Sequence, residues 1–257
     1  MLMFVAFLAF VLTSVGVVWF MLSNDRGTKE PVSALWLAFL LGLLALVIAS
    51  IVESKIIPEA VLLNSTAVPR WQLLGFSAAV GLIEEAAKFW PLALIMYHKS
   101  YFNEHTDGII YFAICGLTFG LVENILYTYQ YGSKVGFTRL LLLPIFHGAT
   151  TAIIGYYAAR LHLRRKSLWN ALPAYGVIAG LHGLYNFGLS SRVNVFALAS
   201  VMTTVMLSIC FVMVYFKATA LDRSMGLSVS GHNDFCRTCG RHNLHHTMFC
   251  ESCGKRS

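Results

Sequence analysis

The chain has 257 residues, of which 57% are hydrophobic and only 12% are charged, and its mean hydropathy is +0.67. A soluble domain carries about 25% charged residues, so this composition excludes an ordinary soluble protein and indicates a polytopic membrane protein. The net charge of +7 does not require a nucleic-acid partner, because basic residues in loops beside membrane spans account for it.

Apolar runs along the chain predict an all-α fold with about seven transmembrane helices. In chain order, the predicted spans cover about Leu2–Leu22, Ser33–Val52, Gln72–Tyr97, Gly108–Tyr131, Arg139–Arg160, Leu168–Ser190 and Val193–Phe216. The first run has neither a basic residue before it nor a small-x-small cleavage site, so we expect a retained span rather than a signal peptide. Hydropathy falls after Lys217, which predicts a membrane domain over 1–217, a linker over 218–233 and a separate tail over 234–257.

The distribution of Lys and Arg predicts which end of each span faces the cytoplasm. If the N-terminus is outside, nine basic residues fall on the inner side and five fall in the outer loops. Because basic residues favour the cytoplasmic side, we expect a multi-pass protein of the cell membrane with an outer N-terminus and a cytoplasmic tail.

The third predicted span carries two adjacent carboxylates, Glu84 and Glu85, near its middle. A charge at the centre of such a helix costs about 2.5–3.5 kcal/mol on insertion scales, so ionisable groups there usually mark a function. Lys88 follows Glu84 by four residues on the same helical face, which predicts that Lys88 neutralises Glu84. Glu85 lies about 100° further round the helix, so we expect it to point elsewhere.

The next three spans each add a polar residue at a similar depth. Glu123, His147 and His182 all lie eight residues from the predicted outer ends of their spans, a depth of about 12 Å. Glu84 lies about 18 Å from that side by the same count. Asn186, four residues after His182, shares its helical face. We therefore expect these side chains to meet in the outer half of the membrane.

These four spans form a polar helical core over about 72–190. The first, second and seventh spans are apolar, and we expect them to pack around this core. Glycines at four-residue spacing, Gly116 with Gly120 and Gly176 with Gly180, predict that helix backbones approach closely within this core.

Carboxylates and histidines gathered away from bulk water can activate a water molecule for hydrolysis. A carboxylate would act as general base, and a histidine with the amide of Asn186 would stabilise the oxyanion formed at a carbonyl. Two histidines and a glutamate are also an adequate zinc-binding set, so water activation by a catalytic metal stays open. The chain has no Gly-x-Ser-x-Gly motif, which disfavours a serine nucleophile.

Two other functions are consistent with the same residues. Carboxylate–histidine clusters relay protons in proton- or ion-coupled transporters, although the chain shows no inverted repeat. A non-catalytic membrane scaffold, in which the polar core only fixes the helix register, is the third interpretation. Ion flux without proteolysis would favour the transporter, and a pure loss of stability on substitution would favour the scaffold.

The chain shares an ordered set of motifs with one known family. Glu84-Glu85-Ala86-Ala87-Lys88 resembles the Glu-Glu-x-x-Lys motif of the PrsW family of intramembrane proteases, and Phe119-x-x-x-Glu123-Asn124 is similar to its second motif. His147 and His182 fall where the later histidines of that family stand. The resemblance covers about 73–189 and extends more loosely to the CAAX prenyl endopeptidase and bacteriocin-processing group.

The resemblance implies an endopeptidase that cleaves membrane-anchored protein substrates, of which a regulatory protein such as an anti-sigma factor is one example. It implies an intramembrane protease of the glutamate type or of the metal-dependent type. The residues that we expect to carry the chemistry are Glu84, Glu85, Glu123, His147, His182 and Asn186.

The tail carries two Cys-x-x-Cys-Gly knuckles separated by ten residues. Their cysteines are Cys236, Cys239, Cys250 and Cys253. Four thiolates at this spacing predict a structural zinc ribbon, and metal binding would supply much of the folding energy of so small a unit. We expect a regulatory or partner-binding role for this ribbon and no nucleic-acid partner, because no aromatic platform accompanies its basic residues.

Overall fold

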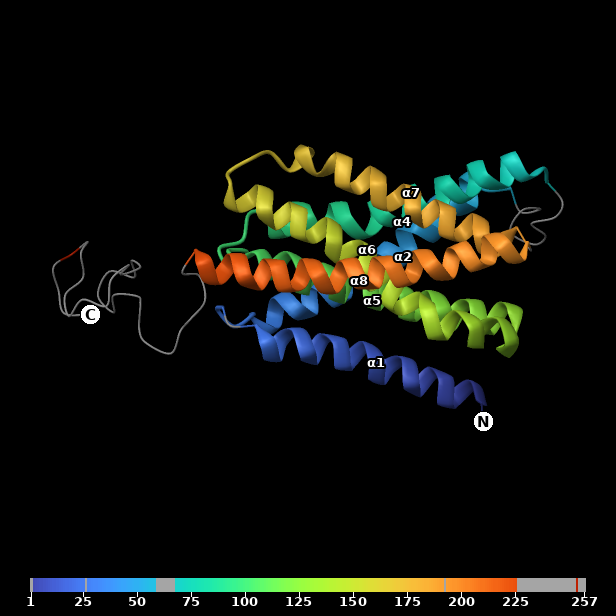
Figure 1. Ribbon diagram of the computed structural model, residues 1–257, viewed down its shortest axis with the longest axis horizontal. Helices are drawn as coiled ribbons and strands as arrows, with labels where there is room; N and C mark the ends of the chain where they lie inside the picture. Colours follow the sequence, from blue (N-terminus) through green and yellow to red (C-terminus); the bar gives the residue numbers. More distant parts are fainter. Residues whose placement is uncertain (1, 26, 59–67, 192, 226–252, 254–257) are drawn as a thin grey trace.

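The computed structural model describes residues 2–25, 27–58, 68–191, 193–225 and 253. These residues form seven α-helices and one short 3-10 helix, so the all-α fold predicted from the sequence is confirmed. The elements are α1 (Leu2–Asn24), α2 (Val32–Ile56), α4 (Arg70–Met96), α5 (His105–Tyr131), α6 (Ser133–Leu163), η2 (Leu168–Ala171), α7 (Leu172–Ser190) and α8 (Asn194–Ser224). Each predicted span coincides with one α-helix, and Figure 1 shows these helices aligned along one long axis.

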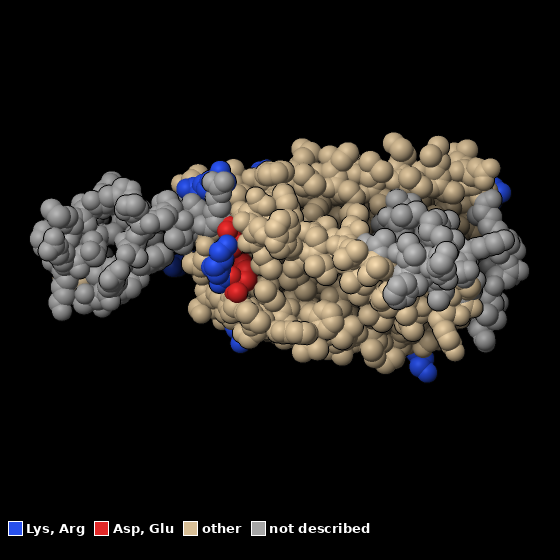
Figure 2. All heavy atoms as spheres, turned by 90° about the horizontal axis from the view of Figure 1, so that it is seen from below, with Lys and Arg blue, Asp and Glu red and all other residues tan. Residues whose placement is uncertain are grey.

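Three of the described helices are long and apolar enough to cross a membrane on their own account: α2, α5 and α8. The helix α4 has a comparable length of 27 residues but carries Arg70, Glu84, Glu85 and Lys88. On the face shown in Figure 2, charged side chains gather toward the end where α8 finishes, and much of the flank is free of charge. The composition and these helices place the protein in a membrane, while the full count of seven spans remains a prediction.

The helices that carry the polar residues are α4, α5, α6 and α7, and they form the centre of the bundle. The most extensive helix contact joins α5 to α6, and α4 packs mainly against α7. On the outside, α2 packs against α4 and α5, whereas α8 packs against α6 and α7. The helix α1 lies at the edge of the bundle and contacts α5 and α6 (Figure 1).

The ends of α5 follow from its local sequence. Glu104 and Asp107 form a capping box, in which the Asp107 carboxylate accepts a hydrogen bond from the Glu104 backbone N–H at 2.8 Å. At the other end, Gly132 has a φ of 86°, a left-handed conformation that glycine adopts without steric cost. These two signals fix the extent of the helix that carries Glu123.

Two predicted glycines allow α5 and α6 to meet at His147. A methyl group on Gly116 would collide with the carbonyl of His147, and one on Gly120 would lie 2.8 Å from the His147 ring. The prediction of close backbone approach is therefore confirmed for this pair.

The same prediction is wrong for Gly176 and Gly180, because nothing lies within 4 Å of the methyl group that each would carry. The close contact between α4 and α7 is made instead by Gly81 and Gly183, where a methyl group on Gly81 would lie 2.6 Å from the Gly183 nitrogen. Spacing alone does not tell which face of α7 meets its neighbour. The face that does so contains Gly183, next to His182.

The predicted linker begins too early, because α8 continues through residues 218–224. Asp222 lies in this extension, and its carboxylate accepts hydrogen bonds from the backbone N–H groups of His105 at 2.8 Å and Thr106 at 3.0 Å. Asp222 thereby caps the start of α5 from a distant part of the chain, which holds the end of α8 on the bundle.

The predicted zinc ribbon lies outside the described residues. Of its four cysteines only Cys253 is described, and it is exposed. The zinc site of the tail therefore stays a prediction.

Candidate functional site

Five of the polar residues singled out from the sequence lie together in the middle of the bundle. Glu84 and Glu85 belong to α4, Glu123 to α5, His147 to α6 and His182 to α7. All five are buried, with exposed fractions between 0% and 7%. We call this group the glutamate–histidine site. It confirms that the four helices bring their polar side chains to one level of the bundle.

Glu85 contacts three other side chains through one of its carboxylate oxygens. Its Oε1 atom accepts hydrogen bonds from Lys88 Nζ at 2.6 Å and Thr150 Oγ1 at 3.0 Å, and lies 2.7 Å from His182 Nδ1. The predicted ion pair of Lys88 with Glu84 is present, with Nζ 4.0 Å from Glu84 Oε2, whereas the expectation that Glu85 points away from Lys88 is wrong. A residue three positions away is also a helical neighbour, and the flexible lysine side chain reaches Glu85 across that interval.

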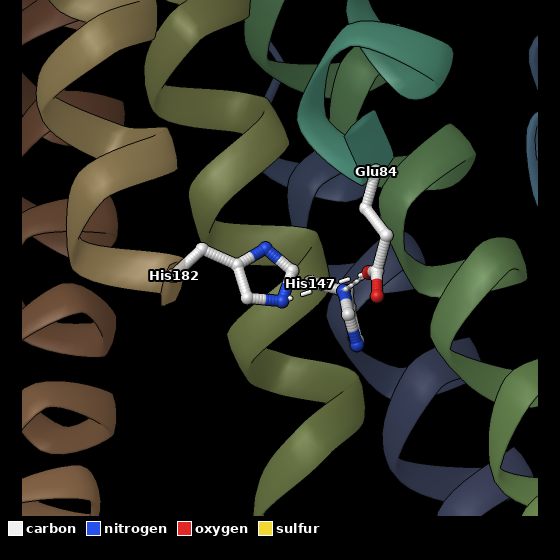
Figure 3. A group of neighbouring side chains, drawn as sticks. All are labelled: Glu84, His147 and His182. Carbon is white, nitrogen blue, oxygen red and sulfur yellow. Dashed lines mark ion pairs between the residues drawn. The ribbon is translucent and has the colours of Figure 1, made fainter. Parts of the chain in front are cut away.

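The two histidines present one ring nitrogen each to Glu84. His182 Nε2 lies 3.5 Å and His147 Nδ1 lies 3.8 Å from Glu84 Oε2. Figure 3 shows both rings turned toward this carboxylate from different helices. The opposite nitrogen of each ring meets another glutamate: His182 Nδ1 meets Glu85, and His147 Nε2 lies 2.8 Å from Glu123 Oε2.

Lys88 supplies a buried positive charge at the centre of this group. Its side chain is 0% exposed, and Nζ lies 3.0 Å from His147 Nδ1 and 4.7 Å from the centroid of the Phe119 ring. The ammonium offsets part of the cost of burying several carboxylates, since buried charges are tolerated when they are paired.

Glu84, His147 and His182 have the composition and spacing of a metal-binding set. One ligand atom from each lies within 4.8 Å of the others. Zinc bound at about 2.0–2.1 Å by tetrahedral ligands separates those ligands by about 3.3–3.4 Å. The distances of 3.5 and 3.8 Å from Glu84 Oε2 to the two histidines are close to this value.

Two further observations agree with a metal at this position. Glu84 Oε2 is buried and accepts no hydrogen bond from the described part of the chain. Glu85 and Glu123 contact the ring nitrogens that face away from Glu84, as carboxylates do behind metal-bound histidines, where they fix the tautomer and the ring orientation. The residues therefore fit a divalent cation held by two imidazoles and one carboxylate, provided that the Lys88 ammonium, 3.0 Å from His147 Nδ1, turns away from that lone pair when the cation binds.

A comparison with protein-family models identifies the family. The model described as "PrsW family intramembrane metalloprotease" matches residues 30–216, which include every residue of the glutamate–histidine site. The chain belongs to the PrsW family. No solved structure matches it.

Curated relatives are similar over parts of the chain. "Protease PrsW" of Bacillus subtilis (strain 168) is 34% identical over 117 residues, which cover 44% of this chain and 53% of that protein. "Protease PrsW" of Geobacillus kaustophilus (strain HTA426) is 29% identical over 175 residues, covering 66% of this chain and 72% of that protein. The protein of the same name in Clostridioides difficile (strain 630) is 28% identical over 191 residues, covering 70% and 76%. The match thus spans about half of the Bacillus subtilis protein and about three quarters of the others.

Asn186 is the one predicted site residue without a contact at the site. It lies on α7 one turn beyond His182 and is partly exposed. Within the described residues no hydrogen bond or ion pair joins Asn186 to Glu84, His147 or His182. Its expected role at an oxyanion stays a prediction.

Two residues near the site were missed by the sequence analysis. Thr150 of α6 donates to Glu85, but a threonine in an apolar run gives no signal of its own because threonines commonly bond to their own helix. Glu53 interacts electrostatically with Glu123 and Glu84. The predicted second span ends at Val52, whereas α2 continues to Ile56 and carries Glu53 on its last turn.

Proposed function

We propose that this protein is an intramembrane endopeptidase that hydrolyses peptide bonds of membrane-anchored proteins. The observation that carries the proposal is the convergence of Glu84, His147 and His182, each histidine being backed by a further glutamate, in a chain of the PrsW family. Buried carboxylates in a membrane protein are costly and are retained where they serve a function.

The proposed metal ligands are Glu84 Oε2, His147 Nδ1 and His182 Nε2, and zinc is the cation that suits this donor set best. A bound zinc supplies a Lewis acid that lowers the pKa of a water molecule and polarises the scissile carbonyl. The role of Glu85 is then to hold His182 through Nδ1, which directs the Nε2 lone pair toward Glu84. Glu123 holds His147 in the same way through Nε2.

Glu85 and Glu123 are the remaining carboxylates, and each of them also holds a histidine ring. One of the two would accept a proton from the attacking water and return it to the leaving amine. Lys88 and the amide of Asn186 would stabilise negative charge on the carbonyl oxygen.

The proposed substrate is a membrane-anchored protein, for instance a regulatory protein such as an anti-sigma factor. The bias of Lys and Arg along the sequence supports an outer N-terminus and a cytoplasmic tail, and with the predicted depths of the site residues this orientation would put the site in the outer half of the bilayer. In the tail, Cys236, Cys239, Cys250 and Cys253 would hold a separate structural zinc, by analogy of spacing with known ribbons. Neither the transporter nor the scaffold interpretation gains support from the comparisons.

Cleavage of a reporter in reconstituted membranes tests the proposal. A single-span protein with a detectable outer domain is co-reconstituted with the purified protein, and release of that domain is followed by time. Glu84→Gln and His182→Ala should abolish release while leaving the helical circular dichroism unchanged.

The matched control is Glu30→Gln, which replaces a partly buried carboxylate in the loop before α2, away from the site. We expect it to retain cleavage. Full cleavage by both Glu84→Gln and His182→Ala would overturn the proposed function.

A further inference from the structure

A second site lies at the end of the bundle where α4 and α6 finish. The loop after α4 and the end of α6 border an open pocket of about 480 Å³, lined among others by Tyr97, Lys99, Phe102, His162 and Arg165. Tyr97 follows Glu84 by thirteen residues along α4, which corresponds to about 20 Å. The pocket is therefore separate from the glutamate–histidine site.

The lining of the pocket is strongly biased in charge. It contains Lys99, Arg165, His98 and His162 and no Asp or Glu. The nearest carboxylate in sequence, Glu104, is buried and accepts hydrogen bonds from Thr28, so it is already engaged elsewhere. The carboxylate of Asp107 accepts hydrogen bonds from the backbone of Asn103 and Glu104, and among the described residues no ion pair joins Lys99 or Arg165 to a carboxylate. The pocket therefore favours an anion.

Aromatic rings build the wall behind these cations. The His162 ring lies between those of Tyr97 and Phe102, with centroid distances of 4.8 and 5.4 Å. Phe102 is buried, and the Tyr97 hydroxyl donates to the backbone carbonyl of Lys166, which ties the α4 end to the loop after α6. The shape of the pocket is thus set by contacts within the protein rather than by exposed side chains alone.

Arg165 occupies a backbone position that glycine would fill with less strain. Its φ is 53°, in the left-handed region. Arg165 N–H donates to the His162 carbonyl at 2.8 Å and Lys166 N–H donates to the Leu161 carbonyl at 2.9 Å, the hydrogen bonds of a Schellman helix end. In that motif the left-handed residue is usually glycine, because a Cβ atom is disfavoured there. A strained backbone at a pocket wall is a recognised sign that the side chain has a role.

We propose that this pocket binds a phosphate-bearing anion. Arg165 offers the planar fork of donors that matches phosphate oxygens, and Lys99 adds a second positive charge. The phosphate has two natural sources at a membrane surface: the headgroup of an anionic phospholipid and a soluble nucleotide. The assignment does not depend on the proposed protease function, since no residue of the glutamate–histidine site takes part.

Binding of two probes to the full-length protein in detergent tests the assignment and separates the sources. Phosphatidylglycerol binding is measured by native mass spectrometry with phosphatidylcholine as reference, and ATP binding is measured by calorimetry. Saturable binding of phosphatidylglycerol alone identifies a lipid headgroup, and binding of ATP alone identifies a soluble phosphate. Absence of both overturns the proposal.

Arg165→Gly is the decisive variant because it separates binding from folding. It should raise the midpoint of thermal unfolding by about 2–4 °C by relieving the left-handed strain, and it should weaken binding by about tenfold or more. Lys99→Gln should weaken binding without changing the midpoint.

The matched control is Arg164→Ala, which removes the same charge from the neighbouring exposed residue that does not line the pocket. Arg164→Ala should keep the affinity of the unsubstituted protein. Equal weakening by Arg164→Ala and Arg165→Gly would show that only the overall charge of this end matters, and would overturn the assigned site.

Discussion

The protein contains two buried polar clusters that differ in how their carboxylates are satisfied. In the cluster around Asp222, both carboxylate oxygens accept hydrogen bonds, from His105 N–H, Thr106 N–H and the Thr106 hydroxyl at 2.8–3.0 Å. Asp107 likewise accepts from two backbone N–H groups. Carboxylates here cap helix ends, so their partners are fixed by the backbone.

In the glutamate–histidine site the partners are side chains, most of them from other helices. Glu84 Oε2 and Glu85 Oε2 accept no hydrogen bond from the described residues, although both atoms are buried. Open buried acceptors are not confined to this site, because Asp25 Oδ2 and Glu30 Oε1 near the Asp222 cluster are also buried without a hydrogen bond from the described residues. The glutamate–histidine site differs in that its open acceptor, Glu84 Oε2, faces ring nitrogens of two histidines from other helices, as a metal site requires.

The largest expected effect on activity concerns the different roles of Glu84 and Glu85 in the glutamate–histidine site. Glu85→Gln keeps the side-chain shape but weakens the anchoring of His182, so cleavage of the reporter should fall by about 10–100-fold. Glu84→Gln, which alters a proposed ligand, should leave no measurable cleavage. Equal residual activity in the two variants would show that Glu84 and Glu85 do not have different roles.

The largest expected effect on stability lies in the other cluster. Asp222→Ala removes the cap of α5 and leaves its first N–H groups without their acceptor, so the free energy of unfolding should fall by about 2–4 kcal/mol. Thermal unfolding followed by circular dichroism in detergent measures this loss. Arg223→Ala, an exposed neighbour on the same helix end, is the control and should have little effect. An unchanged midpoint in Asp222→Ala would contradict a structural role for this cluster.

A smaller effect is expected from Glu30, which precedes α2 next to the Asp222 cluster. Burial, followed by the charge of Asp107, raises the pKa of Glu30 from 4.5 to about 11. The folded protein therefore holds this proton more tightly than the unfolded chain does. The stabilisation is complete below the unfolded pKa and is lost as the pH rises toward the folded pKa.

The loss of stability falls between the unfolded pKa of 4.5 and the folded pKa of about 11. The midpoint of thermal unfolding should therefore decline over the middle of this range, from about pH 6 to pH 9. Glu30→Gln, which cannot ionise, should reduce the decline. An identical slope in Glu30→Gln and in the unsubstituted protein would show that Glu30 does not hold its proton in the folded state.

The sequence predicted the helices and the level at which Glu84, Glu123, His147 and His182 meet. It did so because charges and imidazoles are expensive in a membrane, which makes their depth along each span informative. Depth does not specify rotation about the helix axis. For that reason the contact of Glu85 with Lys88 was not predicted, and a close approach was predicted at Gly176 instead of Gly183.

The remaining errors have a similar origin. Thr150 gives no signal within its own apolar run, and Glu53 lies just beyond the predicted end of its span, so both were recognised only from their contacts with neighbouring helices. The end of α8 was set too early, because Asp222 is held by a contact to α5 that spans 117 residues of sequence. Long-range contacts of this kind leave no local pattern.

The metal content of a full-length variant without the four tail cysteines tests the central claim most directly. The full chain is purified with Cys236, Cys239, Cys250 and Cys253 all replaced by Ser, so that the predicted ribbon cannot contribute. We expect about one zinc ion per chain, lost in His147→Ala and in His182→Ala but retained in Asn186→Ala. If the four-serine variant holds no metal, or if its zinc survives both histidine substitutions, the assignment of Glu84, His147 and His182 as a metal site is contradicted.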